Sequence, residues 1–101
     1  MPYTKNTIPL GDWLAKTIKQ TKVTVGTTAT ALPATSLTNR RYLLVENNSG
    51  ATIYLGDSTV TPTNGVPLAN GASLSINLDA VVVLYGIEAA GGRDIRVLEG
   101  A

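Results

Sequence analysis

The stretch that decides the fold is Arg41 to Gly56, RYLLVENNSGATIYLG, in which two short apolar runs flank a polar centre. The runs are Tyr42 to Val45 and Thr52 to Leu55, and both are rich in the β-branched, aromatic and aliphatic residues that suit a pleated strand. Glu46 to Gly50 lies between them, and its asparagines and glycine tolerate the positive φ angles of a tight turn. The pattern predicts a β-hairpin.

Further short strands are expected on both sides of this hairpin, separated by turn signals such as Asn64-Gly65, Asn70-Gly71 and Gly91-Gly92. Polar and apolar residues alternate in most of them, as in a half-buried strand. The expected strands are Lys22 to Val25, Thr28 to Leu32, Val66 to Leu68, Ser73 to Leu78, Ala80 to Ile87 and Asp94 to Leu98. The fold class is therefore all-β, an antiparallel, jelly-roll-like β-sandwich of about seven or eight short strands over residues 22–101.

The run Ala80 to Ile87, AVVVLYGI, differs from the other predicted strands because it is apolar on both faces. Such a strand is expected in the middle of a sheet, covered on both sides within the domain or on one side by another subunit.

Residues 1–21 form a separate N-terminal arm in this interpretation. Apolar residues at helical spacing, with Asp12 at the start, predict a short amphipathic helix from Asp12 to Lys19. A helix of about two turns is marginal alone and must pack on something. It either caps the core of its own domain or anchors the domain to a partner. The candidate partner contacts are Tyr3, Ile8, Leu10, Trp13, Leu14 and Ile18.

Composition narrows the function. Charged residues make up 15% of the chain, against about 25% in an average soluble domain, which predicts that part of the exterior is covered by self-association or by docking on a larger assembly. Cysteine and histidine are absent, which excludes disulfides, thiol chemistry and imidazole-based catalysis or metal binding. The net charge is +1 and the basic residues are spread along the chain, so a surface that binds nucleic acid is not expected.

The sequence shows no membrane span of about 18 apolar residues and no secretion signal, so synthesis in a cytoplasm is expected. Asp57, Asp79 and Asp94 each sit beside a predicted turn, and turn stabilisation is favoured for them over catalysis or a calcium site at Asp57-Ser58-Thr59. We predict no catalytic residues, no metal and no cofactor.

Tyr42 and Tyr54 are expected on facing strands of the hairpin. A cross-strand aromatic pair is the favoured interpretation, and a shallow contact surface for a saccharide or a protein is the alternative. The glycosylation sequon Asn47-Asn48-Ser49 is read as turn chemistry, because no secretion signal accompanies it.

Several motifs together resemble a small β-rich protein type of tailed bacteriophages. They are NRRYLLVENN at residues 39–48, IYLGDS at 53–58, NGVPL at 64–68, GASLSI at 71–76, LYGI at 84–87 and DIRVLE at 94–99. The similarity covers about residues 22–101, and its motifs consist of strand and turn residues.

The resemblance implies a virion structural protein, a decoration or cement protein on the exterior of the head. Its expected partners are the major capsid protein and itself, as a homotrimer. Pro2 to Pro9 is then expected to add a strand to a sheet edge of the capsid protein. The alternative is a receptor- or carbohydrate-binding module at a tail or fibre tip, using Tyr42, Tyr54 and the loop Asp57 to Pro67.

Overall fold

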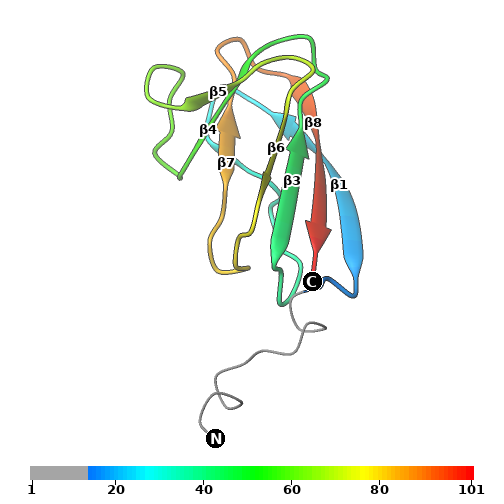
Figure 1. The fold of residues 1–101 in the computed structure, drawn as a ribbon. Coiled ribbons are helices and arrows are strands. Elements are labelled where there is room, and N and C mark those ends of the chain that lie inside the picture. Colours follow the sequence, from blue (N-terminus) through cyan, green and yellow to red (C-terminus); the bar gives the residue numbers. More distant parts are fainter. Residues whose placement is uncertain (1–13) are drawn as a thin grey trace, which may run out of the picture.

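The structure is a computed structural model that describes residues 14–101, and these residues form two four-stranded antiparallel sheets (Figure 1). One sheet has the order β1-β8-β3-β6 and the other has the order β2-β7-β4-β5. The strands are β1 (Ile18–Val25), β2 (Thr30–Ala31), β3 (Tyr42–Glu46), β4 (Ile53–Gly56), β5 (Val66–Leu68), β6 (Ser73–Ile76), β7 (Tyr85–Ile87) and β8 (Arg93–Gly100). The prediction of an all-β, sandwich-like fold is confirmed.

The strand pairs are nested. β1 pairs with β8, β2 with β7, β3 with β6 and β4 with β5, all antiparallel. The chain thus runs as one long hairpin whose tip is β4–β5, and this hairpin is rolled so that its strands alternate between two sheets. That is the connectivity of a jelly roll.

The predicted hairpin at Arg41 to Gly56 is wrong, because β3 and β4 lie in different sheets. Their connection crosses the sandwich, and the fully buried Asn47 makes the crossing possible. Its side-chain Nδ2 donates to the carbonyl oxygens of Ala51 (2.7 Å) and Leu68 (2.8 Å), and its Oδ1 accepts from the Ser49 backbone N (3.0 Å). These bonds supply partners to backbone groups of the crossing, including the buried carbonyl oxygen of Leu68.

The core lies between the sheets and is made by alternate residues of the strands. Ile95 and Val97 are buried in β8, which contains the predicted strand Asp94 to Leu98. The buried cluster contains Val25, Leu32, Leu43, Val45, Ile53, Leu55, Leu68, Ile95 and Val97. The short strand predicted at Val66 to Leu68 is also confirmed, as β5.

The predicted strand Ala80 to Ile87 is wrong for its first half. Only Tyr85–Ile87 is a strand, β7, and residues 80–84 belong to a loop in which Val81 is 85% exposed. The physical reason is that the loop backbone is bonded within itself and to Arg40, which leaves no strand ladder: Val82 N donates to Asp79 O at 3.0 Å.

The predicted helix from Asp12 to Lys19 is not formed where it falls in the described residues. Leu14 to Thr17 is irregular, and Ile18 and Lys19 open β1, whose ladder continues to the pair Ile18–Gly100. Pairing along β8 supplies more backbone hydrogen bonds than a two-turn helix could. The sandwich therefore begins at Ile18 and not at Lys22, and Tyr3, Ile8, Leu10 and Trp13 lie outside the described residues.

Candidate docking end of the sandwich

One end of the sandwich, here called the arm end, gathers the segment before β1, the end of β8 and the loop at residues 77–84 (Figure 1). Backbone bonds hold the segment before β1 to the C-terminal residue of the chain. Lys16 N and Thr17 N donate to Ala101 O at 2.5 and 2.8 Å, and Ala101 N donates to Thr17 O at 2.9 Å. Lys16 and Thr17 are therefore held against the end of β8.

Leu14 and Ile18 are the two predicted partner contacts that the structure describes. Leu14 is 58% exposed, and Ile18 is 71% exposed at the start of β1. Neither caps the core of its own domain, which was the other interpretation of this segment. Their exposure leaves them available to a partner.

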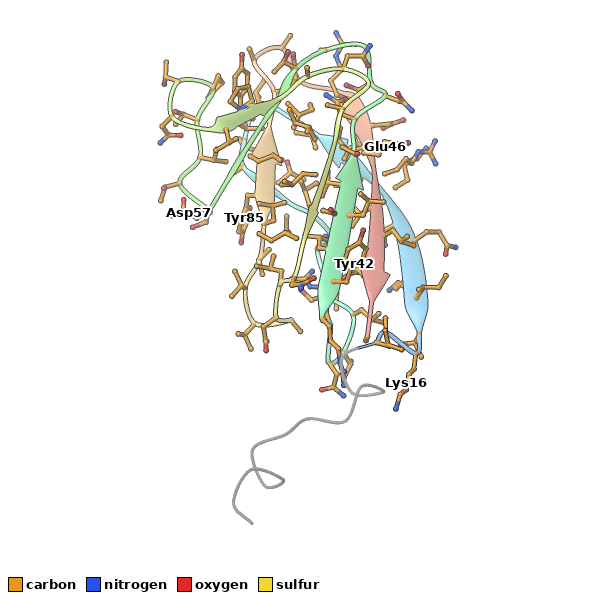
Figure 2. All side chains as sticks on the ribbon, viewed as in Figure 1. Lys16, Tyr42, Glu46, Asp57 and Tyr85 are labelled. Carbon is orange, nitrogen blue, oxygen red and sulfur yellow. The ribbon has the colours of Figure 1, made fainter. Side chains whose placement is uncertain are left out.

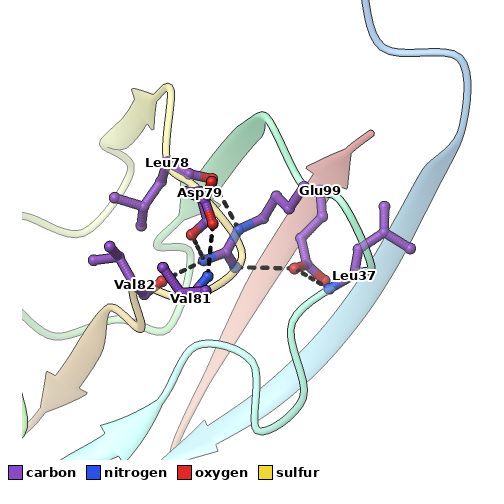
Figure 3. Close-up of polar contacts among 7 residues, drawn as sticks. Leu37, Leu78, Asp79, Val81, Val82 and Glu99 are labelled. Carbon is purple, nitrogen blue, oxygen red and sulfur yellow. Dashed lines mark hydrogen bonds and ion pairs between the residues drawn. The ribbon is translucent and has the colours of Figure 1, made fainter.

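Arg40 fixes the neighbouring loop at residues 77–84 (Figure 3). Its guanidinium donates from Nε to Leu78 O (3.2 Å) and from Nη2 to Asp79 O (3.2 Å) and Val82 O (2.5 Å). Arg40 is only 3% exposed, so the loop is held from within the fold. Sequence reasoning missed this residue, although its place in the unusual pair Arg40-Arg41 could have drawn attention to it.

The charge of Arg40 is balanced by Glu99 of β8. Arg40 Nη1 lies 3.0 Å from Glu99 Oε2, and the same oxygen accepts from Leu37 N at 2.8 Å. Both side chains of the pair are fully buried. The pair therefore links the end of β8, the β2–β3 connection and the loop at residues 77–84 into one unit (Figure 3).

The fixed loop displays two valines to solvent. Val81 is 85% exposed and Val82 is 48% exposed. Asp79 caps the turn, because its Oδ1 accepts from Val81 N at 2.9 Å. The arm end thus presents four exposed aliphatic side chains, those of Leu14, Ile18, Val81 and Val82, on supports that are themselves bonded in place.

Basic side chains stand beside these aliphatic ones. Lys16, Lys19 and Arg41 are exposed, and Figure 2 shows Lys16 at the arm end. Within residues 14–101 the ion pairs are Lys22–Asp94 and Arg40–Glu99, so none of these three basic groups is neutralised there. A surface of this chemistry suits a partner that is apolar with carboxylates around it.

The tyrosines do not pair as predicted. Tyr42 is in β3 and Tyr54 is in β4, so the two lie in different sheets and cannot form a cross-strand pair. Tyr54 shares the outer face of its sheet with Tyr85, because Tyr54 is opposite Ile87 and Gly56 is opposite Tyr85 in the same ladder.

A hollow of about 290 Å³ lies in the β4–β5 hairpin, lined by residues 55–57, 59, 60 and 64–66. Its polar side chains are hydrogen-bonded within the same hairpin. Thr59 donates to Asp57 Oδ1 from its Oγ1 (2.6 Å) and its backbone N (2.8 Å), and these bonds lower the pKa of Asp57 below its ordinary value. Asn64 Oδ1 accepts from Thr61 N at 2.7 Å.

The predicted turn role is confirmed for Asp57 and Asp79, whereas Asp94 lies in β8 and accepts from Thr24 Oγ1 at 2.9 Å. Among residues 14–101, no three acidic groups come together in a way that could hold a metal ion. The sequon asparagine, Asn47, is fully buried and closed to modification in the folded chain. No helix within the described part of the chain is long and apolar enough to cross a membrane.

Comparison with known proteins identifies no family. No family description matches the chain, and no curated protein matches it. A solved chain with a similar arrangement comes from the disulfide-linked pili that form Bacillus endospore appendages; it is 22% identical, the match covers 84% of this chain and 88% of that one, and the TM-score is 0.42. A likeness this distant does not bear on function.

Proposed function

We propose that this protein is a virion structural protein that decorates the exterior of a phage head and stabilises the shell by docking its arm end on the major capsid protein. The observation that carries the proposal is the exposure of Leu14, Ile18, Val81 and Val82 at one end of the sandwich. Burying exposed aliphatic side chains on a partner lowers the free energy because it removes apolar surface from water. The entropy cost of binding is reduced where the backbone that carries them is already held by hydrogen bonds.

The chemistry of the arm end agrees with this partner. The uncompensated Lys16, Lys19 and Arg41 favour a surface with carboxylates. A protein that binds the assembled lattice and not its separate subunits raises the stability of the lattice by mass action.

The test is co-sedimentation with heads assembled from the major capsid protein of the same genome. Val81→Lys is expected to weaken binding at least about tenfold, because it places a charge in the apolar contact. The matched control is Val66→Lys, at a valine that is 66% exposed in β5, away from the arm end. If Val81→Lys and Val66→Lys both bound like the unaltered protein, the arm end would not be the docking surface.

A deletion of residues 2–13 measures the contribution of the arm itself. The cut stops before Leu14, because a longer deletion would remove Ile18 to Gln20 from their pairs with Gly100 to Leu98. Retained binding by the shortened protein would assign the contact to the sandwich alone.

The second candidate function is a receptor- or carbohydrate-binding module, favoured by the hollow in the β4–β5 hairpin and by Tyr54 beside it. The hollow is at the small end of ligand sites, which are about 300–1,000 Å³. Its polar side chains are already hydrogen-bonded within the hairpin. Glycan-array binding that Tyr54→Ala abolishes would favour this function over head decoration.

A further inference from the structure

The four edge strands of the sandwich are not equally protected. They are β1 and β6 in one sheet and β2 and β5 in the other. Proteins blunt such edges with lysine, proline or short strand length, because an open edge invites another chain to pair. β1 carries Lys19 and Lys22, β5 carries Pro67, and β2 has only two residues. β6, with four residues of sequence SLSI, has neither lysine nor proline.

The core beside β6 is also incompletely covered. Ile76 of β6 is opposite the buried Leu43, so it belongs to the inner face, yet it is 41% exposed. Val66 of the other sheet's edge strand β5 is opposite the buried Leu55 and is 66% exposed. Two core-facing aliphatic side chains on edge strands are therefore left for something else to cover.

The sequence of β6 and the next residue is complementary to itself. Ser73, Ser75 and Asn77 are polar and exposed, and Leu74 and Ile76 alternate with them on the inner face. Two antiparallel copies centred on Ser75 would place Leu74 opposite Ile76 and Ser73 opposite Asn77, with inner face matched to inner face. No like charges would meet, whereas two β1 edges would bring lysines together.

We propose that β6 is a self-association edge, and that a second copy of this chain adds its own β6 antiparallel to it across a two-fold axis through Ser75. The β1-β8-β3-β6 sheets of the two copies then form one continuous sheet. Each Ile76 is covered by the inner face of the partner copy. A contact built on a strand of four residues is small, so its Kd is expected to be in the micromolar range.

The experiment uses the full chain and measures mass by light scattering and sedimentation equilibrium from about 1 to 300 μM, a range that brackets a micromolar Kd. The expected mass rises from 10.5 kDa toward twice that value. Ser75→Lys and Ser75→Asp each place two like charges face to face, and each should raise the dimer Kd about tenfold or more. An equimolar mixture of the two variants should recover a heterodimer at least as strong as the unaltered dimer.

Gln20→Lys and Gln20→Glu are the controls, because they add the same charges at an exposed position on the β1 edge. Both should leave the dimer Kd unchanged within about twofold. The proposal is overturned if the unaltered chain stays at 10.5 kDa or forms trimers. It is also overturned if either Ser75 variant dimerises normally while its thermal unfolding and circular dichroism show an intact fold.

Discussion

Asn47 should be among the most sensitive polar positions in the fold, because it carries the crossing from β3 to β4. Asn47→Ala removes the amide donor to the carbonyl oxygens of Leu68 and Ala51. The bond to Leu68 O is buried, whereas Ala51 O keeps a 3.3 Å bond from Ser49 Oγ. Leaving the buried Leu68 O without the amide donor costs about 1–3 kcal/mol, and the lost bond to Ala51 O adds about 1 kcal/mol. The loss is therefore roughly 2–4 kcal/mol of an unfolding free energy that is about 5–15 kcal/mol for a domain.

Asn47→Asp extends the test to pH. The new carboxylate would face the same two carbonyl oxygens, so ionisation is disfavoured in the folded state and the pKa of the introduced group is raised above its ordinary value of about 3.9. When the pKa of an acid is higher in the folded state than in the unfolded state, its ionised form destabilises the fold. This destabilisation is fully present above the folded-state pKa and decreases as the pH falls toward the unfolded-state pKa. Asn47→Asp should therefore gain stability relative to Asn47→Ala between pH 7 and pH 4.

Urea unfolding at both pH values measures these differences. Asn48→Ala is the control, since Asn48 is exposed and donates only a 3.3 Å bond to Glu46, and it should change stability by less than about 0.5 kcal/mol. The reasoning is refuted if Asn47→Ala is as stable as Asn48→Ala, or if the gap between the Asp and Ala variants at position 47 does not close at low pH.

Three further changes test other parts of the fold. Arg40→Met leaves Glu99 buried without its cation and should cost about 3–5 kcal/mol by urea unfolding, far more than Arg41→Met at the exposed neighbour. Gly65→Ala should cost about 1–3 kcal/mol in thermal unfolding, because a Cβ there would lie 2.7 Å from two side-chain carbons. Thr59→Ala should raise the pKa of Asp57 toward its ordinary value in an NMR titration, because it removes the Thr59 hydroxyl bond. The lowered pKa of Asp57 contributes stability that is present above the unfolded-state pKa and is lost as the pH falls through the folded-state pKa, and this contribution should become smaller in the variant.

The positions of strands were predictable from the sequence, but their partners were not. Two apolar runs around a centre that contains asparagine and glycine predict two strands and a connection. This pattern is the same whether the chain turns back to pair with itself or crosses to the opposite sheet. What distinguishes the β3–β4 connection is that Asn47 is buried and hydrogen-bonded to Leu68 of β5, which lies 21 positions further along the chain. No local pattern reports such a contact, whereas the long Asp57 to Gly65 loop belongs to the hairpin that does form.

The proposed contact surface at the arm end was predictable only in part. Leu14 and Ile18 are exposed, and their role as partner contacts stays a prediction, whereas the helix expected to carry them is not formed in the described residues. The valines at 81 and 82 were expected inside a sheet because their run is uniformly apolar, and hydrophobicity alone does not tell a central strand from a loop displayed to a partner. The difference lies in Arg40, whose hydrogen bonds to the loop carbonyls come from a distant part of the sequence.

The two proposed contacts have a geometric consequence for each other. β6 runs toward the arm end, so an antiparallel β6 pair places the arm ends of the two copies at opposite ends of the dimer (Figure 1). Such a dimer can seat only one of its two arm ends on a given shell, while the second copy points away from it. Dimerisation is therefore not required for shell binding. Ser75→Lys is expected to bind heads as well as the unaltered protein or better, while Val81→Lys should lose heads and keep the dimer. A folded Ser75→Lys protein that failed to bind heads would instead place β6 in the shell contact.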